Sequence, residues 1–470
     1  MNTVMRHELT RLYRERSVRW VASAMTAVVM VAALAALVSR QRDARARAEA
    51  SEYAQRRWLD QGAKNPHGAA HFGTFVFAPV RVLSALADGD AGAFGTVVRV
   101  EAHVRTPLGG RALTSIPTIG RFGWPTPVGM CELLLPLLAI ALGHGAFSGD
   151  AERGLESTLR ATGVGPVRLA VGKLLGAELA LLSSIAPALV AVALLTVLVE
   201  PTGATLVGAT AIIVGIGVYG WMWTAIAVAI SAACRRESVS FVVGLGLWAI
   251  TCVVLPQLAA EHAAARHHLR GDASFDQDVR ADLGAGPDDG DSADARIEAL
   301  RDAVLAEHGV ERVEDLPLNF DGLALQEGEE HSAEVYAEHF DRAWDALLSQ
   351  QQVVDAAAIA APSIALRRWS SAIAQTDLVA QRTVAESVED FRRAWVAALN
   401  ADLTTGSRTG DHEYRADAAL WSSVPQFEPP PSPGFSALAR RGMPGGVVLL
   451  GWSLVATLAV VGLGATRERR

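Results

Sequence analysis

The chain has 470 residues, of which 50% are hydrophobic and 20% charged, and its formal net charge is −8. This apolar content excludes a disordered chain, because disordered chains are poor in apolar residues. The length argues against one soluble domain. The apolar residues cluster in long runs, which indicates a multi-pass membrane protein.

The charge is unevenly distributed along the chain. Residues 257–442 contain 33 acidic and 16 basic side chains, whereas the rest contains 26 basic and 17 acidic ones. Neither part is a basic domain of the kind that binds nucleic acid, so we expect no nucleic-acid partner. The three cysteines, Cys131, Cys234 and Cys252, lie in or beside apolar runs and form no CxxC. This spacing excludes a zinc ribbon or a thioredoxin-type site.

Six apolar runs approach or exceed the roughly 20 residues that a helix needs to cross a bilayer. We expect membrane spans at residues 20–38, 128–147, 174–199, 203–233, 239–256 and 445–464. Basic clusters occur at both termini and in the two short loops, and with six spans all of these clusters lie on the same side of the membrane. Because short basic loops stay in the cytoplasm, we expect a plasma-membrane protein with both termini, including the tail 465–470, in the cytoplasm. The arginines at positions 40, 42, 45 and 47 oppose this orientation, because they follow the first span on the outer side. The alternative is a cleaved signal peptide that ends near Val38.

Two long polar segments, 39–127 and 257–442, then lie outside, and we expect them to pack into one extracytoplasmic domain. Residues 41–61 lack Gly and Pro and should extend the first span as a helix. Residues 95–104 alternate between apolar and polar side chains, with Val98 to Val104 on the apolar face, which predicts a half-buried strand.

The second polar segment contains an amphipathic helix pattern. Between residues 377 and 400, the apolar side chains from Val384 to Leu399 recur every three or four positions and form one face. The expected fold class is therefore mainly α. It combines six transmembrane helices with a mostly helical extracytoplasmic domain that has minor β structure and is built from two insertions.

Residues 1–19 form a basic amphipathic stretch. We expect a helix that lies in the inner interface and is attracted to anionic lipid, although a simple orientation signal is an alternative. Residues 148–173 connect the second and third spans with a polar, glycine-containing loop of both charges. This loop is too short for a domain, but it could hold a short helix that receives force from a soluble partner. The alternative is an ordinary connection.

The chain contains neither the phosphate-binding pattern GxxxxGK[ST] nor a catalytic pattern such as HExxH or GxSxG. We therefore expect no catalytic residues and no cofactor in this chain. If the protein performs driven work, another chain must supply the energy.

Three histidines of the first polar segment are candidate metal ligands. His67 and His71 are four residues apart, a spacing that puts both on one helix face, and with His103 they could form a copper or zinc site. Pro66 and Gly68 weaken the expected helix, and no Cys or Met cluster accompanies the histidines. We therefore expect packing and hydrogen bonding at these residues, and no metal.

The loop 148–173 and its flanking spans resemble the permease subunit of ABC-2 type transporters. In that family a run like E-x-E-x-G-T-L, followed by Pro-Val or Gly-Val and by Gly-Lys, forms the coupling segment that contacts the ATPase. Asp150, Glu152 and Gly154 match the start, Leu155 and Glu156 replace the usual Thr and Leu, and residues 161–164 and 172–173 match the end. The resemblance implies that ATPase coupling involves Asp150, Glu152, Arg153, Gly154, Leu155, Leu159, Gly163 and Val164.

Residues 65–103 and 362–400 resemble a branch of this family with a large outer domain of unknown function, often labelled permeases of the multi-copper enzyme maturation type. The resemblance covers nearly the whole chain. It implies an exporter-like permease in the bilayer, paired with a second copy or a sister permease and driven by an ABC ATPase subunit that binds ATP and Mg. Three alternatives remain: a complex that transmits force without moving a substrate, a membrane-anchored enzyme, and a passive scaffold.

Overall fold

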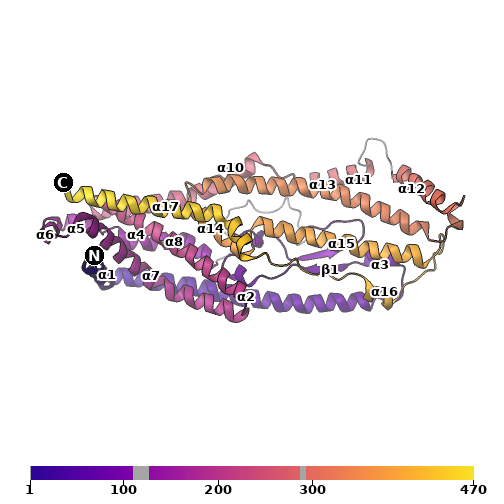
Figure 1. The fold of residues 1–470 in the computed structure, drawn as a ribbon, viewed down its shortest axis with the longest axis horizontal. Helices are drawn as coiled ribbons and strands as arrows, with labels where there is room; N and C mark the ends of the chain where they lie inside the picture. Colours follow the sequence, from indigo (N-terminus) through magenta and orange to yellow (C-terminus); the bar gives the residue numbers. More distant parts are fainter. Residues whose placement is uncertain (1, 109–125, 286–292, 470) are drawn as a thin grey trace.

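The computed structural model describes residues 2–108, 126–285 and 293–469. The chain is 78% helical and has one small two-stranded sheet in the described ranges, which confirms a mainly α fold. The molecule is elongated, with a helical bundle at one end and a second helical body at the other (Figure 1). Both termini lie at the bundle end. We call the second body, formed by the described residues of 39–127 and 257–442, the distal domain.

In the described ranges, the bundle contains seven longer helices. Two short helices connect α4 to α7 at the end of the bundle where both chain termini lie. The long helices are α1 (Asn2–Arg14), α2 (Arg16–Leu59), α4 (Pro127–Gly143), α7 (Pro166–Val199), α8 (Gly203–Ala233), α9 (Glu237–Trp248) and α17 (Phe435–Arg469). The short helices are α5 (Ser148–Glu152) and α6 (Glu156–Ala161). A π-helical turn, Ala249–Val254, connects α9 to α10 (Leu255–Arg266).

Six helical segments of the described chain are long and apolar enough to cross a membrane. They begin at Val18, Pro127, Pro166, Gly203, Glu237 and Phe435, and each contains one predicted span. The prediction of six spans is confirmed, while the level of the bilayer along the helices stays a prediction. Helix α8 lies in the middle of the bundle and contacts α4, α7 and α17. Outward-facing side chains such as Leu198 and Leu458 remain exposed, as expected for a surface that lipid covers.

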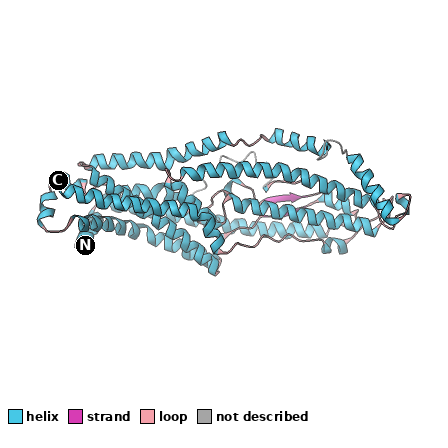
Figure 2. Cartoon of the chain, turned by 45° about the horizontal axis from the view of Figure 1, so that its top comes forward, coloured by secondary structure: helices cyan, strands magenta, loops and turns pink. Residues whose placement is uncertain are grey.

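The distal domain is a helical body that encloses a small sheet (Figure 2). Its further elements are α3 (Pro66–Phe72), β1 (Thr74–Phe77), β2 (Val97–Val100), α11 (Asp272–Ala285), α12 (Ala293–His308), α13 (Phe320–Ala357), α14 (Pro362–Ala374), α15 (Leu378–Gly406) and α16 (Ala418–Ser423). Short 3-10 turns occupy Val82–Ala85, Ala91–Ala93 and Val313–Asp315.

Aromatic packing joins the two polar segments in one core. Trp58, at the end of α2, lies with its ring centroid 4.8 Å from that of Trp395 and 5.6 Å from that of Trp421. The helix predicted at 41–61 is confirmed as far as Leu59. The apolar face predicted for α15 is also confirmed, because Trp395 and Leu399 are buried in this core.

The predicted strand 95–104 is shorter than expected. Only Val97–Val100 form β2, which pairs antiparallel with β1 so that Val100 lies opposite Thr74. Val98, Val100 and Ala102 are buried as predicted, but Val104 is 41% exposed, so its assignment to the buried face was wrong. The reason is that the chain reverses between Glu101 and Val104, where His103 has a φ of 64°. A non-glycine residue in this left-handed region is uncommon and ends the strand.

Helix α14 connects the distal domain to the bundle. It contacts α17, α8 and α4, and the indole Nε1 of Trp369 donates a hydrogen bond of 2.9 Å to the carbonyl of Ala211 in α8. Gly445 permits a close approach, because a Cβ there would lie 2.4 Å from the carbonyl oxygen of Ala365. The π-helical turn meets α14 as well, with Ser363 Oγ donating to the carbonyl of Thr251 over 3.3 Å. Helix α14 is therefore in direct contact with several helices of the bundle.

Candidate functional site

Helices α5 and α6 lie at the end of the bundle that carries both termini (Figure 1). Gly154, with a φ of 70°, turns the chain between them, and Gly163, with a φ of 69°, turns it between α6 and α7. Helix α7 then begins at Pro166, a residue well suited to the first helical position. Residues 166–173, which the sequence placed in the connecting loop, are therefore helical.

A buried lysine ties this region together. The Nζ atom of Lys173 in α7 donates to Glu8 Oε1 over 2.6 Å, to Asp150 Oδ2 over 2.5 Å and to the carbonyl of Ala146 over 2.5 Å. Lys173 is 3% exposed. An ammonium group has three N–H donors, and all three are used here. One side chain thus joins α1, the α4–α5 turn, α5 and α7.

Helix α1 packs closely against α7 at this point. A Cβ on Gly176 would lie 2.6 Å from Cβ of Glu8, so only glycine lets the two helices come this near. Glu8 also accepts from Arg11 Nε over 2.8 Å. Burial opposes the negative charge of Glu8, but Lys173 and Arg11 outweigh it and hold the pKa of this carboxyl below its ordinary value. Glu8 is therefore ionised and paired at neutral pH.

Two further contacts attach α5 to the bundle. Ser231 Oγ, near the end of α8, accepts from the backbone N–H groups of Phe147 and Ser148 over 2.9 and 3.0 Å. Glu152 accepts from the backbone N–H of Glu237 over 3.0 Å, at the start of α9. A carboxylate at a helix N-terminus is stabilised by the helix dipole. Helix α5 is thus held by α7, α8 and α9 together.

The tip of the α5–α6 region remains accessible. Leu155 is 41% exposed, and Arg153, Gly154 and Gly163 are exposed as well. Leu159 and Val164 instead pack against the bundle core. The residues proposed from the sequence thus divide into an anchored set and an exposed set.

A second buried ion pair lies farther along α4. Glu132 is 3% exposed and accepts from Arg367 of α14, with Nη2 to Oε2 at 2.7 Å and Nε to Oε1 at 3.3 Å. Two parallel bonds of this kind fix both side chains. Tyr219 of α8 donates to the backbone carbonyl of Glu132 over 2.9 Å. This pair joins the bundle to α14 of the distal domain.

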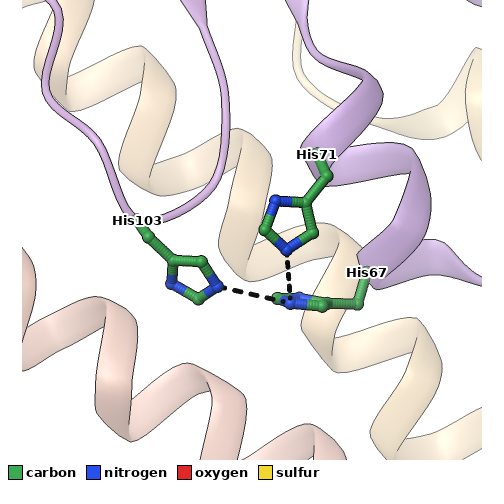
Figure 3. A group of neighbouring side chains, drawn as sticks. All are labelled: His67, His71 and His103. Carbon is green, nitrogen blue, oxygen red and sulfur yellow. Dashed lines mark hydrogen bonds between the residues drawn. The ribbon is translucent and has the colours of Figure 1, made fainter.

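The structure also brings the three candidate histidines together (Figure 3). His67 and His71 lie one turn apart on α3, and His103 lies in the turn that follows β2. The Nε2 atom of His67 is 3.1 Å from Nε2 of His71 and 3.4 Å from Nε2 of His103. Burial, followed by the neighbouring His103 and His71, lowers the pKa of His67.

Comparison with protein families identifies the bundle. Residues 2–281 match the family described as ABC-2 family transporter protein. The chain belongs to the ABC-2 transporter family. Residues 273–429 match a second family, described as a domain of unknown function (DUF3526). No curated protein matches the chain. The resemblance inferred from the sequence is thereby confirmed, and the ABC-2 chain is a multi-pass membrane permease with an additional domain.

Two residues of the buried Lys173 network, Glu8 and Lys173 itself, were not among the site residues proposed from the sequence. Glu8 stands as a lone acid in a basic helix, and Lys173 was noted only as part of the Gly-Lys match. The sequence offered one sign of their importance: Glu8 is an acid among basic residues, and Lys173 is a base at the start of an apolar run. Their pairing across 165 positions was not visible in any local pattern.

Proposed function

We propose that this chain is the permease subunit of an exporter-type ABC transporter, and that a separate ATPase subunit binds ATP and Mg and drives it. The ABC-2 match supports the permease role. The observation that carries the coupling proposal is the Lys173 network, which links the exposed α5–α6 tip to three parts of the bundle. An ATPase that pushed this tip would move buried, charge-paired elements rather than a loose loop.

The contacts suggest a route for this movement. Force on Leu155 reaches α5, and from there α7 and α1 through Lys173, α8 through Ser231, and α9 through Glu152. Helix α4 begins beside α14 and ends next to α5, so it can carry the displacement along the bundle. The Glu132–Arg367 pair then passes it to α14 and the distal domain.

In this proposal the termini and the α5–α6 tip face the cytoplasm, and the distal domain lies outside the plasma membrane. Two permease chains, identical or sister, pair in the bilayer above two ATPase subunits. The exposed apolar faces of α2, α9 and α17, with residues such as Val31, Val242 and Leu454, provide surface for lipid and for the second permease.

The ATPase contact can be tested with a charge on the tip. The full chain is co-expressed with each ABC ATPase subunit of its source genome in turn and is purified by a tag on the permease. Wild type should retain the ATPase, whereas Leu155→Asp should reduce the retained amount at least about tenfold, because loss of a hot-spot side chain at the centre of an interface costs about 2 kcal/mol or more. The readout is the ATPase-to-permease ratio.

The matched control is Tyr53→Asp, which places the same charge on an exposed aromatic residue of α2 in the distal domain. It should retain the ATPase at the wild-type ratio. Equal retention by Leu155→Asp and Tyr53→Asp would contradict the assignment of the tip, and no retention by wild type would contradict the ATPase proposal as a whole.

A second function, force transmission to outside partners without transport, is favoured by one observation. Helix α2 runs unbroken for 44 residues, from the terminal end of the bundle to the aromatic core of the distal domain. ATP-driven accumulation of a compound in inverted vesicles separates the two functions. Accumulation that is lost with Leu155→Asp supports transport, and ATP hydrolysis without accumulation of any tested compound favours force transmission.

A further inference from the structure

The three histidines of the distal domain are held by elements from different parts of the chain. His67 and His71 come from α3, whose first turn is capped by Asn65 Oδ1, and His103 comes from the reversed turn after β2. In Figure 3 the rings of His71 and His103 both point toward the ring of His67. The ligand atoms of all three rings lie within 4.8 Å of one another.

The distances between the nitrogen atoms fit a shared metal ion. Zinc binds imidazole nitrogen at about 2.0–2.1 Å, so two nitrogens in a tetrahedral arrangement lie about 3.4 Å apart. The two Nε2 to Nε2 distances from His67 are 3.1 and 3.4 Å. The remaining pair, His71 and His103, is held within 4.8 Å, so these two rings move closer together when an ion binds between them.

With all three rings neutral, hydrogen bonds among them do not satisfy every one of the facing nitrogen atoms. His103 Nδ1 lies 2.8 Å from Glu329 Oε1, and since a carboxylate only accepts, this nitrogen carries the hydrogen. When this ring is neutral, its Nε2 atom has a lone pair. His67 Nε2 has either one hydrogen or one lone pair, so it cannot satisfy both neighbouring rings. A cation between the three nitrogens satisfies all of them.

Glu329 of α13 supplies the support that metal-binding histidines usually have. Its Oε1 accepts from both the backbone N–H and Nδ1 of His103, over 2.7 and 2.8 Å. Arg392 of α15 holds the other oxygen, Oε2, over 2.9 Å. A carboxylate behind a ligating imidazole fixes the ring orientation and raises the basicity of the ligand nitrogen. The φ of 64° at His103 shows that the backbone is held in an uncommon conformation to present this ring.

We propose that His67, His71 and His103 bind a divalent metal ion of the zinc type in the distal domain, with a fourth coordination position open to water. Three neutral imidazoles are ligands that Zn²⁺ and Co²⁺ accept. Through His103 the site is connected to α13 and α15, because His103 contacts Glu329 and Glu329 contacts Arg392. This proposal replaces the expectation of packing without a metal, and it does not depend on the proposed ATP-driven function.

The test uses the full-length protein, purified in detergent through a histidine-free tag and treated with a chelator. Titration with Co²⁺ should give one bound ion per chain with the visible absorption of tetrahedral cobalt, and Zn²⁺ should displace it. His71→Ala should weaken Zn²⁺ binding more than about 100-fold, because loss of a supporting group alone costs about 10–100-fold. His71 is exposed, so this change leaves the core intact.

The matched control is His412→Ala, which removes an exposed histidine elsewhere in the distal domain and should bind Zn²⁺ as wild type does. Glu329→Gln keeps the size of the side chain, and it should weaken Zn²⁺ binding about 10–100-fold. The proposal is overturned if chelator-treated wild type binds no Co²⁺ or Zn²⁺, or if His71→Ala and wild type bind them equally.

Discussion

Lys173→Met should separate α5 from α1 and α7. In the assembled complex, the permease should then no longer stimulate ATP hydrolysis by the ATPase subunit. The change leaves Glu8 and Asp150 without the ammonium group that joins them, and Glu8 is 3% exposed. Removal of one partner from a buried ion pair typically costs about 3–5 kcal/mol. We therefore expect a lower melting temperature of the purified chain together with lost ATPase stimulation, measured by thermal unfolding and phosphate release.

The control for this change is Arg168→Met, which removes an exposed charge five residues earlier on α7. It should leave both measurements near the wild-type values. The triple change Glu8→Gln, Asp150→Asn, Lys173→Met should recover most of the stability, because it removes together the three charges that meet at Lys173, while Arg11 keeps its contact with Glu15. If Lys173→Met and Arg168→Met behave alike, the network does not hold the coupling region.

Arg367→Met should uncouple the distal domain from the bundle while the ATPase stays bound. It leaves the buried carboxylate of Glu132 without its bidentate partner, at an expected cost of about 3–5 kcal/mol. Because α5 and α6 lie at the end of the bundle away from α14, ATPase retention should be unchanged (Figure 1). Thermal unfolding and limited proteolysis of the distal domain report the effect.

The double change Glu132→Gln, Arg367→Met closes a double-mutant cycle for this pair, and it should lose less stability than the sum of the two single changes. Arg393→Met, at an exposed position of α15, is the matched control. Strict additivity of the two single changes would show that the pair does not join the bundle to α14.

The spans and the helical character of this protein were predictable because they depend on local patterns. An apolar run of about 20 residues has few alternatives to a membrane helix, and the period of the apolar residues in α15 reports its buried face directly. The strand β1 was not predicted, because Thr74–Phe77 is too short for a clear alternation and becomes a strand by pairing with β2.

The candidate site likewise has features that local sequence patterns predict and features that depend on contacts between distant segments. Asp150 and the α5–α6 region were found through a family motif, but the role of Glu8 depends on the close approach of α1 and α7 at Gly176, which no local pattern encodes. The spacing of His67 and His71 was readable, whereas the position of His103 beside them depends on the turn after β2. Contacts between distant segments are set by tertiary packing. His103 was named from the sequence as the third candidate histidine, but the pairing of Glu8 with Lys173 was missed.

The central claim is that the α5–α6 tip and the distal domain lie on opposite sides of the membrane. Its most direct test is cysteine labelling of a chain in which the native Cys131, Cys234 and Cys252 are replaced. Leu155→Cys and Gln352→Cys, both at exposed positions, are treated with a membrane-impermeant maleimide on intact spheroplasts and after lysis. We expect Gln352→Cys to react in intact spheroplasts and Leu155→Cys only after lysis. The account is contradicted if both positions react in intact spheroplasts, or if both react only after lysis.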